Sequence, residues 1–351
     1  IDFKDNTKGA LLLEPTRSNV LLQSNQFDTT WLKNNVTILG GQSGIYGSSD
    51  AWLLQRGDGL ARFLGQTVSI SSSSTLSVYA KKGNSNWLFL SDGTGKNKYF
   101  DLENGVIGNV GTASNSLIEL IGNGWYRCSI TVSNGESRIY PAVGDGVVSG
   151  LVGANIYIQH AQLEVGSYPT SIIFTSGSAV TRVADTCSQT VPNGVSLSTT
   201  GTVFLDYTLN IDLVSAAHFP FSITDYNNNS SNEWLTRGSF RFTINTNGSV
   251  TYEFVLLSAA ISTTTTVSDI FTSIGSRGKM AVSWNGTNVT FSVNGVNYQD
   301  TLSTNFTGSL DGIYLGVLGT FNNTYKGGQF NDIKLYNTRL SNAELQALTT
   351  I

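Results

Sequence analysis

The sequence predicts an all-β protein made of two antiparallel β-sandwich (jelly-roll) domains in tandem, with one short helical turn near the C-terminal end. Short runs in which apolar and polar residues alternate recur along the chain, separated by turn clusters such as "SNGE" and "VNGV". Charged residues make up only 13%, against roughly 25% in an average globular domain, which disfavours long solvated helices. A length of 351 residues exceeds one ordinary sandwich and suits two.

Alternation with a period of two residues predicts the strands in order along the chain. The clearest in the first half are residues 75–82, 86–91, 125–132 and 155–159. Those in the second half are residues 202–209, 239–244, 251–257, 279–284, 289–294 and 312–318. Helical spacing is confined to "SNAELQALTT" at residues 341–350, where Ser341 is the predicted N-cap and Glu344 follows three residues later.

A change in sequence composition near residue 190 sets the predicted domain boundaries. Residues 1–190 form the first sandwich, residues 191–198 the linker and residues 199–351 the second sandwich. The linker "VPNGVSLS" contains both Pro and Gly, as interdomain hinges commonly do. The preceding stretch, residues 160–188, alternates poorly, and we expect it to leave the sheet and to close the first domain as an ordered seam.

Charge and hydropathy exclude two classes of partner. The formal net charge is −4 and no run of Lys or Arg occurs, so the sequence predicts no binding to nucleic acid. No apolar run approaches the ~20 residues of a membrane-spanning helix, so we expect no membrane insertion. The two cysteines, Cys128 and Cys187, match no zinc-binding spacing. Each is either a small buried apolar residue or one half of a single disulfide bridge.

The sequence offers little that could support catalysis, and we expect a non-enzymatic protein. The two histidines, His160 and His218, are far apart in the sequence, and nothing around either resembles a nucleophile–base arrangement. Acidic residues are scattered singly, without the pair of carboxylates that a glycoside hydrolase requires. We predict no cofactor, although a structural calcium ion held by loop residues such as Asp92 or Asp145 stays open.

Alternation also sorts the strands of the first half by face, because successive side chains point to opposite sides of a sheet. In residues 125–132, Tyr126 and Cys128 belong to the apolar row, so Trp125 and Arg127 face the other way. The rows opposite the core collect aromatic, cationic and amide side chains: Tyr79, Lys81, Trp125, Arg127, Arg138, Tyr140, Tyr157 and Gln159.

This composition suits a sugar-binding face, because aromatic rings stack on the apolar face of a sugar ring and long polar side chains bind its hydroxyls. The alternative is that another part of the chain covers these residues or that they form an amphipathic sheet surface. The candidate carbohydrate-binding residues on the strands are Tyr79, Trp125, Arg127, Tyr140, Tyr157 and Gln159.

Two tryptophans in polar loops complete the set of candidate carbohydrate-binding residues. Trp52 belongs to the loop 44–59, where it is either part of the rim of the site or packs the loop itself. Trp234 follows the run "NNNSSNE", which is expected at the surface because a run of Asn and Ser cannot form a packed core. Trp234 is therefore either an anchor of its loop or an exposed stacking platform.

The first half of the chain resembles the carbohydrate-binding-module-like domain found in tail proteins of many phages and prophages. The matching phrases include "GALLLEPTRSNVLLQSNQFD" (9–28), "IGNGWYRCSITV" (121–132) and "IYIQHAQLEVGSYPTSIIFTSGSAVTRVADTCS" (156–188). The last phrase is the most specific one. One departure stands out, since members of that family commonly have Trp-Gly where this chain has Gln159 and His160.

The second half resembles laminin-G and concanavalin-like lectin domains, in "GKMAVSWNGTNVTFSVNGV" (278–296) and "GGQFNDIKLYNTRLSNAELQAL" (327–348). Together the two resemblances imply a non-catalytic protein of a phage virion or tail that faces the exterior and binds a host-surface glycan. They also imply other virion or tail proteins as partners, and they leave a homotrimer open. Two alternatives are a structural module that decorates or joins a fibre and, with less support, a polysaccharide depolymerase or lyase.

Overall fold

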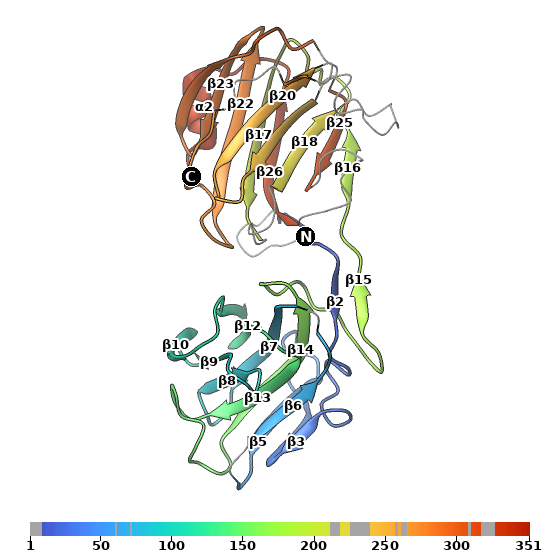
Figure 1. Ribbon diagram of the computed structural model, residues 1–351, viewed down its shortest axis with the longest axis vertical. Coiled ribbons are helices and arrows are strands. Elements are labelled where there is room, and N and C mark those ends of the chain that lie inside the picture. Colours follow the sequence, from blue (N-terminus) through green and yellow to red (C-terminus); the bar gives the residue numbers. More distant parts are fainter. Residues whose placement is uncertain are drawn as a thin grey trace. The chain divides into compact units, whose positions relative to one another are not determined.

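The computed structural model describes residues 9–59, 62–70, 72–210, 218–224, 239–256, 259–260, 265–307, 310–316 and 327–351 (Figure 1). It divides into two compact units. One, which we call the inserted unit, is continuous and runs from Arg17 to Val183. The other, the outer unit, is discontinuous and combines Ile1–Thr16 with Ala184–Ile351. The predicted all-β class is confirmed.

The inserted unit is a sandwich of two antiparallel six-stranded sheets. The first, the β7 sheet, has the order β11 (Leu117–Gly122), β12 (Trp125–Val132), β7 (Ser74–Lys82), β14 (Asn155–Val165), β5 (Ala51–Arg56) and β4 (Val36–Gln42). The second, the β13 sheet, has the order β10 (Val106–Gly111), β9 (Asn97–Asp101), β8 (Trp87–Ser91), β13 (Glu136–Ala142), β6 (Phe63–Thr67) and β3 (Leu32–Asn34). A separate pair, β2 (Arg17–Asn19) with β15 (Val180–Arg182), joins the two ends of the unit.

The core of the inserted unit consists of the side chains that the alternation pattern assigned to it. Leu76, Val78 and Ala80 of β7 are fully buried, and so are Cys128 and Ile130 of β12. They meet apolar side chains of the facing β13 sheet: Leu64, Leu88, Leu90, Phe100 and Ile139. The predicted division of each strand into a core face and an opposite face is therefore confirmed for these strands.

The described residues of the outer unit also form two six-stranded antiparallel sheets. One has the order β1 (Leu11–Leu13), β26 (Gly328–Tyr336), β17 (Thr200–Thr208), β22 (Arg277–Asn285), β23 (Asn288–Val293) and β24 (Val296–Thr301). The other has the order β16 (Cys187–Thr190), β25 (Gly312–Leu315), β18 (His218–Thr224), β19 (Ser239–Ile244), β20 (Val250–Leu256) and β21 (Ala259–Ala260). Buried aromatic residues fill the space between them: Phe221, Phe240, Phe242, Phe254, Trp284 and Phe291.

The predicted C-terminal helix is present as α2 (Asn342–Thr349), and its cap is the one that the sequence indicates. The Ser341 hydroxyl accepts a hydrogen bond from the Glu344 N–H, while the Glu344 carboxylate accepts one from the Ser341 N–H at 2.8 Å. Leu345 is fully buried against Phe204 of β17 and Ala281 of β22. The helix thus covers the outer face of the β17 sheet, because its single apolar side packs there.

The domain boundaries in the structure differ from the predicted ones. Residues 187–190, assigned by sequence to the first sandwich, form β16 and pair with β25 of the outer unit. Leu11–Leu13 pairs with β26 of the same unit. In the predicted linker, Leu197 is buried and forms a bridge with Leu310. Alternation reveals that a segment is extended, but it does not reveal the strand with which that segment pairs.

Both cysteines are free. Cys128 lies in the core of the inserted unit and Cys187 at the start of β16 in the outer unit, so the alternative of a bridge between them is not found. Burial raises the pKa of both thiols, most strongly that of Cys128. Among the described residues, no helix is both long and apolar enough to cross a membrane.

Candidate functional site

The predicted row of aromatic and polar side chains exists on the β7 sheet. In the register of β12 and β7, Arg127 lies opposite Tyr79 and Trp125 opposite Lys81. In that of β14 and β7, Tyr157 lies opposite Lys81 and Gln159 opposite Tyr79. The side chains of Tyr79, Trp125, Arg127, Tyr157 and Gln159 therefore share the face of this sheet that points away from the main core.

This face is covered by the chain itself, which corrects the prediction that it is open to a ligand. The exposed fraction is 0% for Gln159, 1% for Trp125, 6% for Tyr79 and 7% for Arg127. The Ile45 N–H donates a hydrogen bond of 3.0 Å to Gln159 Oε1. Ile45 packs with Tyr79 and Trp125 in a second apolar cluster, and the half-buried Tyr157 and Ile172 flank that cluster. The row is thus a small second core rather than a stacking platform.

His160 is part of the same covered layer. It has a φ of +47°, at a point where the register between β14 and β7 shifts. Its ring makes edge contacts with Tyr79 and Phe174, at centroid distances of 6.0 and 5.0 Å. Burial lowers the pKa of His160 to about 4, with a smaller lowering by Arg127 that Asp50 opposes. The histidine is therefore neutral near pH 7 and serves to pack the layer.

The two loop tryptophans have different outcomes. Trp52 lies in β5 rather than in a loop, and its partly buried side chain packs against the main core beside Phe27, at a ring distance of 6.2 Å. Its indole N–H donates to the Asn25 carbonyl oxygen at 2.9 Å, so Trp52 is a core anchor and not part of a rim. Trp234 lies outside the described residues, and its role stays a prediction.

Tyr140 is the candidate that the structure places on a partly open face, on the opposite sheet of the sandwich. It belongs to a row of four rings on the outer face of the β13 sheet, which we call the aromatic ladder: Tyr99 (β9), Phe89 (β8), Tyr140 (β13) and Phe63 (β6). Consecutive ring centroids are 4.3, 5.0 and 5.4 Å apart. The two central rings, Phe89 and Tyr140, are half-buried, whereas the outer two are buried.

Two charged side chains of β13, Arg138 and Glu136, lie on the same face beside the ladder. The Arg138 guanidinium lies over the Phe63 ring at 4.5 Å from its centroid and donates a hydrogen bond of 2.6 Å from Nε to Glu136. Burial lowers the pKa of Arg138, but its hydrogen bonds with Tyr140 and Glu136 outweigh this and raise it above its ordinary value. Burial raises the pKa of Tyr140, so its hydroxyl is neutral: it accepts the hydrogen bond from Arg138 and keeps its own proton to donate.

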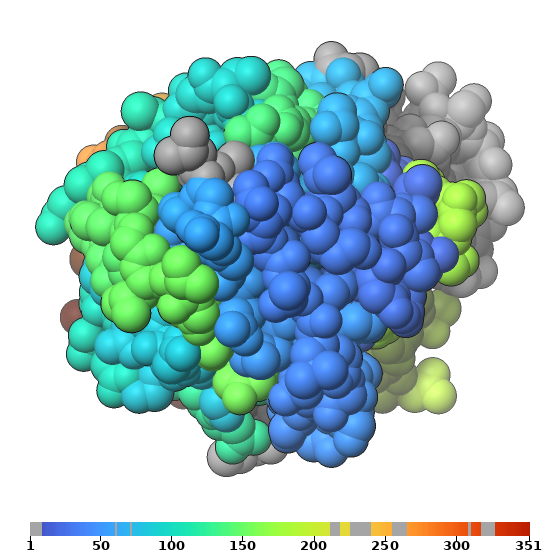
Figure 2. Space-filling view, turned by 90° about the horizontal axis from the view of Figure 1, so that it is seen from below, coloured from blue at the N-terminus to red at the C-terminus, as the bar shows by residue number. Residues whose placement is uncertain are grey.

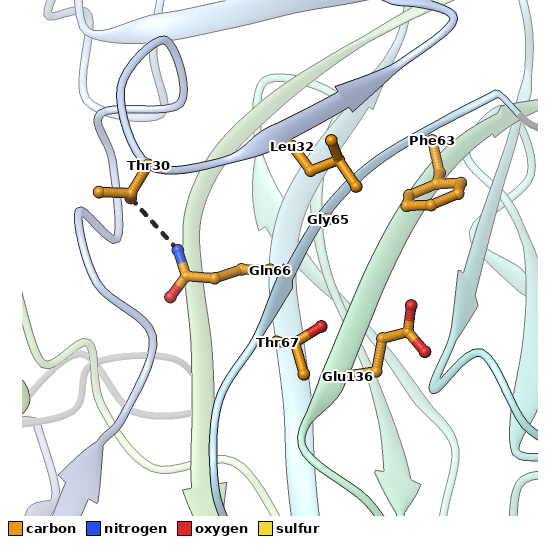
Figure 3. Close-up of a pocket in the computed structure, with 7 residues that line it drawn as sticks. All are labelled: Thr30, Leu32, Phe63, Gly65, Gln66, Thr67 and Glu136. Carbon is orange, nitrogen blue, oxygen red and sulfur yellow. Dashed lines mark hydrogen bonds between the residues drawn. The ribbon is translucent and has the colours of Figure 1, made fainter.

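A pocket of about 160 Å³ continues this face beyond Phe63 (Figure 3). Gly65 leaves room for the Phe63 ring, since a Cβ atom there would lie 2.9 Å from two ring carbons. The Gln66 amide donates to the Thr30 hydroxyl at 3.4 Å, which ties the wall of the pocket to the loop before β3. The lining residues are Thr30, Leu32, Phe63, Gly65, Gln66, Thr67 and Glu136.

The ladder and the pocket together offer apolar ring faces beside a cation, a carboxylate and hydroxyl groups. Alternation within residues 86–91 could have revealed Phe89, because it faces away from the buried Leu88 and Leu90. Tyr99 joins the ladder through the consecutive strands β8 and β9, in which it lies opposite Phe89. The contribution of Phe63 arises only from the pairing of β6 with β13, which are distant in sequence. Among the described residues, no group of three or more His, Cys, Asp or Glu side chains could hold a metal ion.

The two aspartates considered as calcium ligands bind backbone N–H groups instead. Asp92 Oδ1 accepts hydrogen bonds from the N–H groups of Thr94, Gly95 and Lys96 at 2.9–3.1 Å. Burial raises the pKa of Asp92, but these bonds outweigh it, and the pKa is lowered overall. Asp145 accepts hydrogen bonds from the N–H groups of Asn109 and Val110 at 2.6 and 3.2 Å. Both carboxylates therefore stabilise loops.

Comparisons with known proteins find similarity in structure alone. No protein-family model matches the chain, and no curated protein matches its sequence. The chain is similar to a native heptameric SAP-like pentraxin from Limulus polyphemus, with a TM-score of 0.32 and 11% identity over 44% of this chain and 76% of the pentraxin.

Two further structures are similar to a comparable extent. A leech intramolecular trans-sialidase has a TM-score of 0.33 and 16% identity over 47% of this chain, which spans only 27% of the enzyme. Sheep galectin-11 has a TM-score of 0.29 and 11% identity over 44% of this chain and 99% of the galectin. Similarities of this extent say nothing about what the chain binds.

Proposed function

We propose that the chain is a non-catalytic carbohydrate-binding protein and that the outer face of the β13 sheet of the inserted unit binds the sugar. The observation that carries this proposal is the aromatic ladder, whose two central rings are half-buried and lie beside the Arg138–Glu136 pair. Aromatic faces stack on the C–H face of a sugar ring, and fixed charged groups bind its hydroxyls.

The dimensions of the ladder suit a short oligosaccharide. It crosses four adjacent strands, and neighbouring strands lie roughly 4.8 Å apart, so the rings extend over about 14 Å. Hydroxyl groups give up hydrogen bonds to water when they bind, so each site contributes little net affinity. Repeated copies of the site would supply avidity, in agreement with a role in which many copies meet a polysaccharide surface.

The finer proposal is that the glycan lies on a host cell surface and that the chain belongs to an exterior-facing phage virion or tail protein. Other tail proteins and further copies of the same chain, as in a homotrimer, are then its partners. The sequence resemblance of residues 9–188 supports this part of the proposal.

Binding to a glycan array, followed by titration calorimetry with the bound sugars, tests the proposed function. Tyr140→Ala removes a central ring and should weaken binding about tenfold or more, which corresponds to about 1.4 kcal/mol. Tyr46→Ala is the matched control, because Tyr46 is 78% exposed and lies before β5 of the other sheet. Thermal unfolding of both variants shows that each is folded.

Two outcomes would contradict the proposal. One is that neither the array nor intact host polysaccharide is bound. The other is that the Tyr140→Ala variant binds as tightly as the wild type. If host adsorption also persists in that variant, a structural role in the virion accounts for the protein better. Release of reducing ends from host polysaccharide would instead show that the chain is an enzyme.

A further inference from the structure

A buried arginine lies at one end of the inserted unit. Arg56 is the last residue of β5 and follows Leu54, which belongs to the main core, by two positions. Because side chains two residues apart in a strand point to the same side, Arg56 faces the space between the two sheets. It is 1% exposed. Its backbone pairs with the segment before β14, through the bond from the Arg56 N–H to the Ala154 oxygen at 2.9 Å.

The Arg56 guanidinium lacks the partners that a buried charge requires. Its Nε, Nη1 and Nη2 atoms are all buried, and none has a hydrogen-bond acceptor among the described residues. Such a group is strongly unfavourable unless it is paired, because burial removes its hydration. A guanidinium group has five N–H donors, so the unmet demand here is for a strong acceptor with several lone pairs.

A second arginine lies just before a strand of the facing sheet. Arg62 directly precedes β6 and lies two residues before Leu64, another member of the main core. It is half-buried, and its Nε atom is also buried without an acceptor among the described residues. Burial lowers the pKa of Arg56, and the positive charge of Arg62 lowers it further. The two residues between Arg62 and Gly59 are Leu60 and Ala61, which carry no carboxylate.

We infer that Arg56 and Arg62 form a binding site for one oxyanion, namely a carboxylate, sulfate or phosphate group. An oxyanion supplies several acceptor lone pairs to two guanidinium groups at once, and the planar guanidinium fork matches two of its oxygens. Because Arg62 is only half-buried, such a group would reach Arg56 past the Arg62 side chain. Figure 2 shows this end of the inserted unit, where segments near residue 50 (blue) and near residue 150 (green) lie side by side.

This site is independent of the aromatic ladder. The ladder lies on the outer face of the β13 sheet, whereas Arg56 points between the sheets from β5. Arg62 directly precedes Phe63 of the ladder, whereas Arg56 lies on the other sheet. Substitution of Arg56 therefore leaves the ladder intact, and tests of the two proposals can fail separately. The anion is either free in solution or attached to a larger molecule such as an acidic sugar, and the two sources share the same binding chemistry.

Titration calorimetry of the full chain against sodium phosphate, sodium sulfate and sodium glucuronate tests the site, with sodium chloride at equal ionic strength as the reference. We expect at least one of the three anions to bind with a stoichiometry of one. A concentration of that anion about tenfold above its Kd should raise the melting temperature of the inserted unit by roughly 3–5 °C. Preference for glucuronate over the inorganic anions would identify the source as a sugar acid.

Arg56→Met and Arg62→Gln should each weaken binding of that anion about tenfold or more, because each removes charge-assisted hydrogen bonds. Arg56→Met replaces a buried charge by an apolar chain and should not lower stability in chloride. Arg62→Gln changes a half-buried side chain, so it keeps the test valid if the first variant does not fold. Lys33→Met is the control, because Lys33 is exposed on β3 and its substitution removes one positive charge as well.

The inference is overturned if none of the three anions binds more tightly than chloride, which would mean that water alone solvates the pair. It is also overturned if binding persists unchanged in Arg62→Gln, because the anion would then lie elsewhere.

Discussion

Acidification should destabilise the inserted unit through His160, and the structure sets the size of the effect. The pKa of the buried imidazole is about 4, below its ordinary value of 6.5. Between these values the unfolded chain binds a proton that the folded chain excludes. The contribution of neutral His160 to the free energy of unfolding is therefore fully present above pH 6.5 and is lost as the pH falls. At 1.36 kcal/mol per pH unit, the full loss amounts to about 3 kcal/mol, of which about 2 kcal/mol is lost by pH 5.

Thermal unfolding measured from pH 8 to pH 5 would detect this loss. For a unit of this size, about 2 kcal/mol lowers the melting temperature by roughly 4–8 °C. His160→Asn is the informative variant, because Asn accepts the positive φ of this position and does not titrate in this range. Carboxylates and His218 are common to both proteins, so their contributions cancel in the difference between the two profiles.

The difference between wild type and His160→Asn should therefore grow steadily in favour of the variant below pH 6.5. Parallel profiles from pH 8 to pH 5 would refute the reasoning, since they would mean that the imidazole takes up its proton without leaving the folded state. Asp50, which raises the pKa of His160, is the group that would permit such uptake.

Three further predictions concern stability. Trp125→Ala should cost about 3–5 kcal/mol in denaturant unfolding, as expected for a buried ring; a loss below about 1 kcal/mol would show that its cover opens readily. Gly65→Ala should cost about 1–3 kcal/mol through overpacking, because its Cβ would meet the Phe63 ring at 2.9 Å and the Ser137 oxygen at 3.1 Å. An unchanged melting temperature would count against this contact. Ser341→Ala removes the capping box and should destabilise the outer unit by about 1 kcal/mol, whereas Ser268→Ala, at an exposed position outside any helix, should leave the melting temperature within experimental error.

The strands could be predicted from sequence because each has a strong local pattern. The segments β12 and β19 begin and end at the predicted residues, and the capping box of α2 is legible in Ser341 and Glu344 alone. Residues 239–244 illustrate why, since Phe240, Phe242 and Ile244 alternate with polar residues and are all fully buried. A period of two fixes both the strand and its core face without any knowledge of the partner strands.

The exposure of the opposite face could not be predicted in the same way. Alternation correctly placed Tyr79 and Trp125 away from the main core, but it carries no information on whether a distant segment covers them. Ile45 and Ile172 provide that cover. Ile45 precedes the strands of Tyr79 and Trp125 in the sequence, and Ile172 follows them. Tyr140 faces away from the core by the same pattern but belongs to the other sheet, where it is half-buried.

The pairing of β2 with β15 has a consequence for how such a chain can change over evolutionary time. It holds the first and last strands of the inserted unit next to each other, while the outer unit resumes at Ala184 after leaving off at Thr16. Recombination at these two points would replace the whole of residues 17–183 and leave the strand order of the outer sandwich unchanged. A lineage could thus exchange one inserted sandwich for another while the outer sandwich keeps its fold.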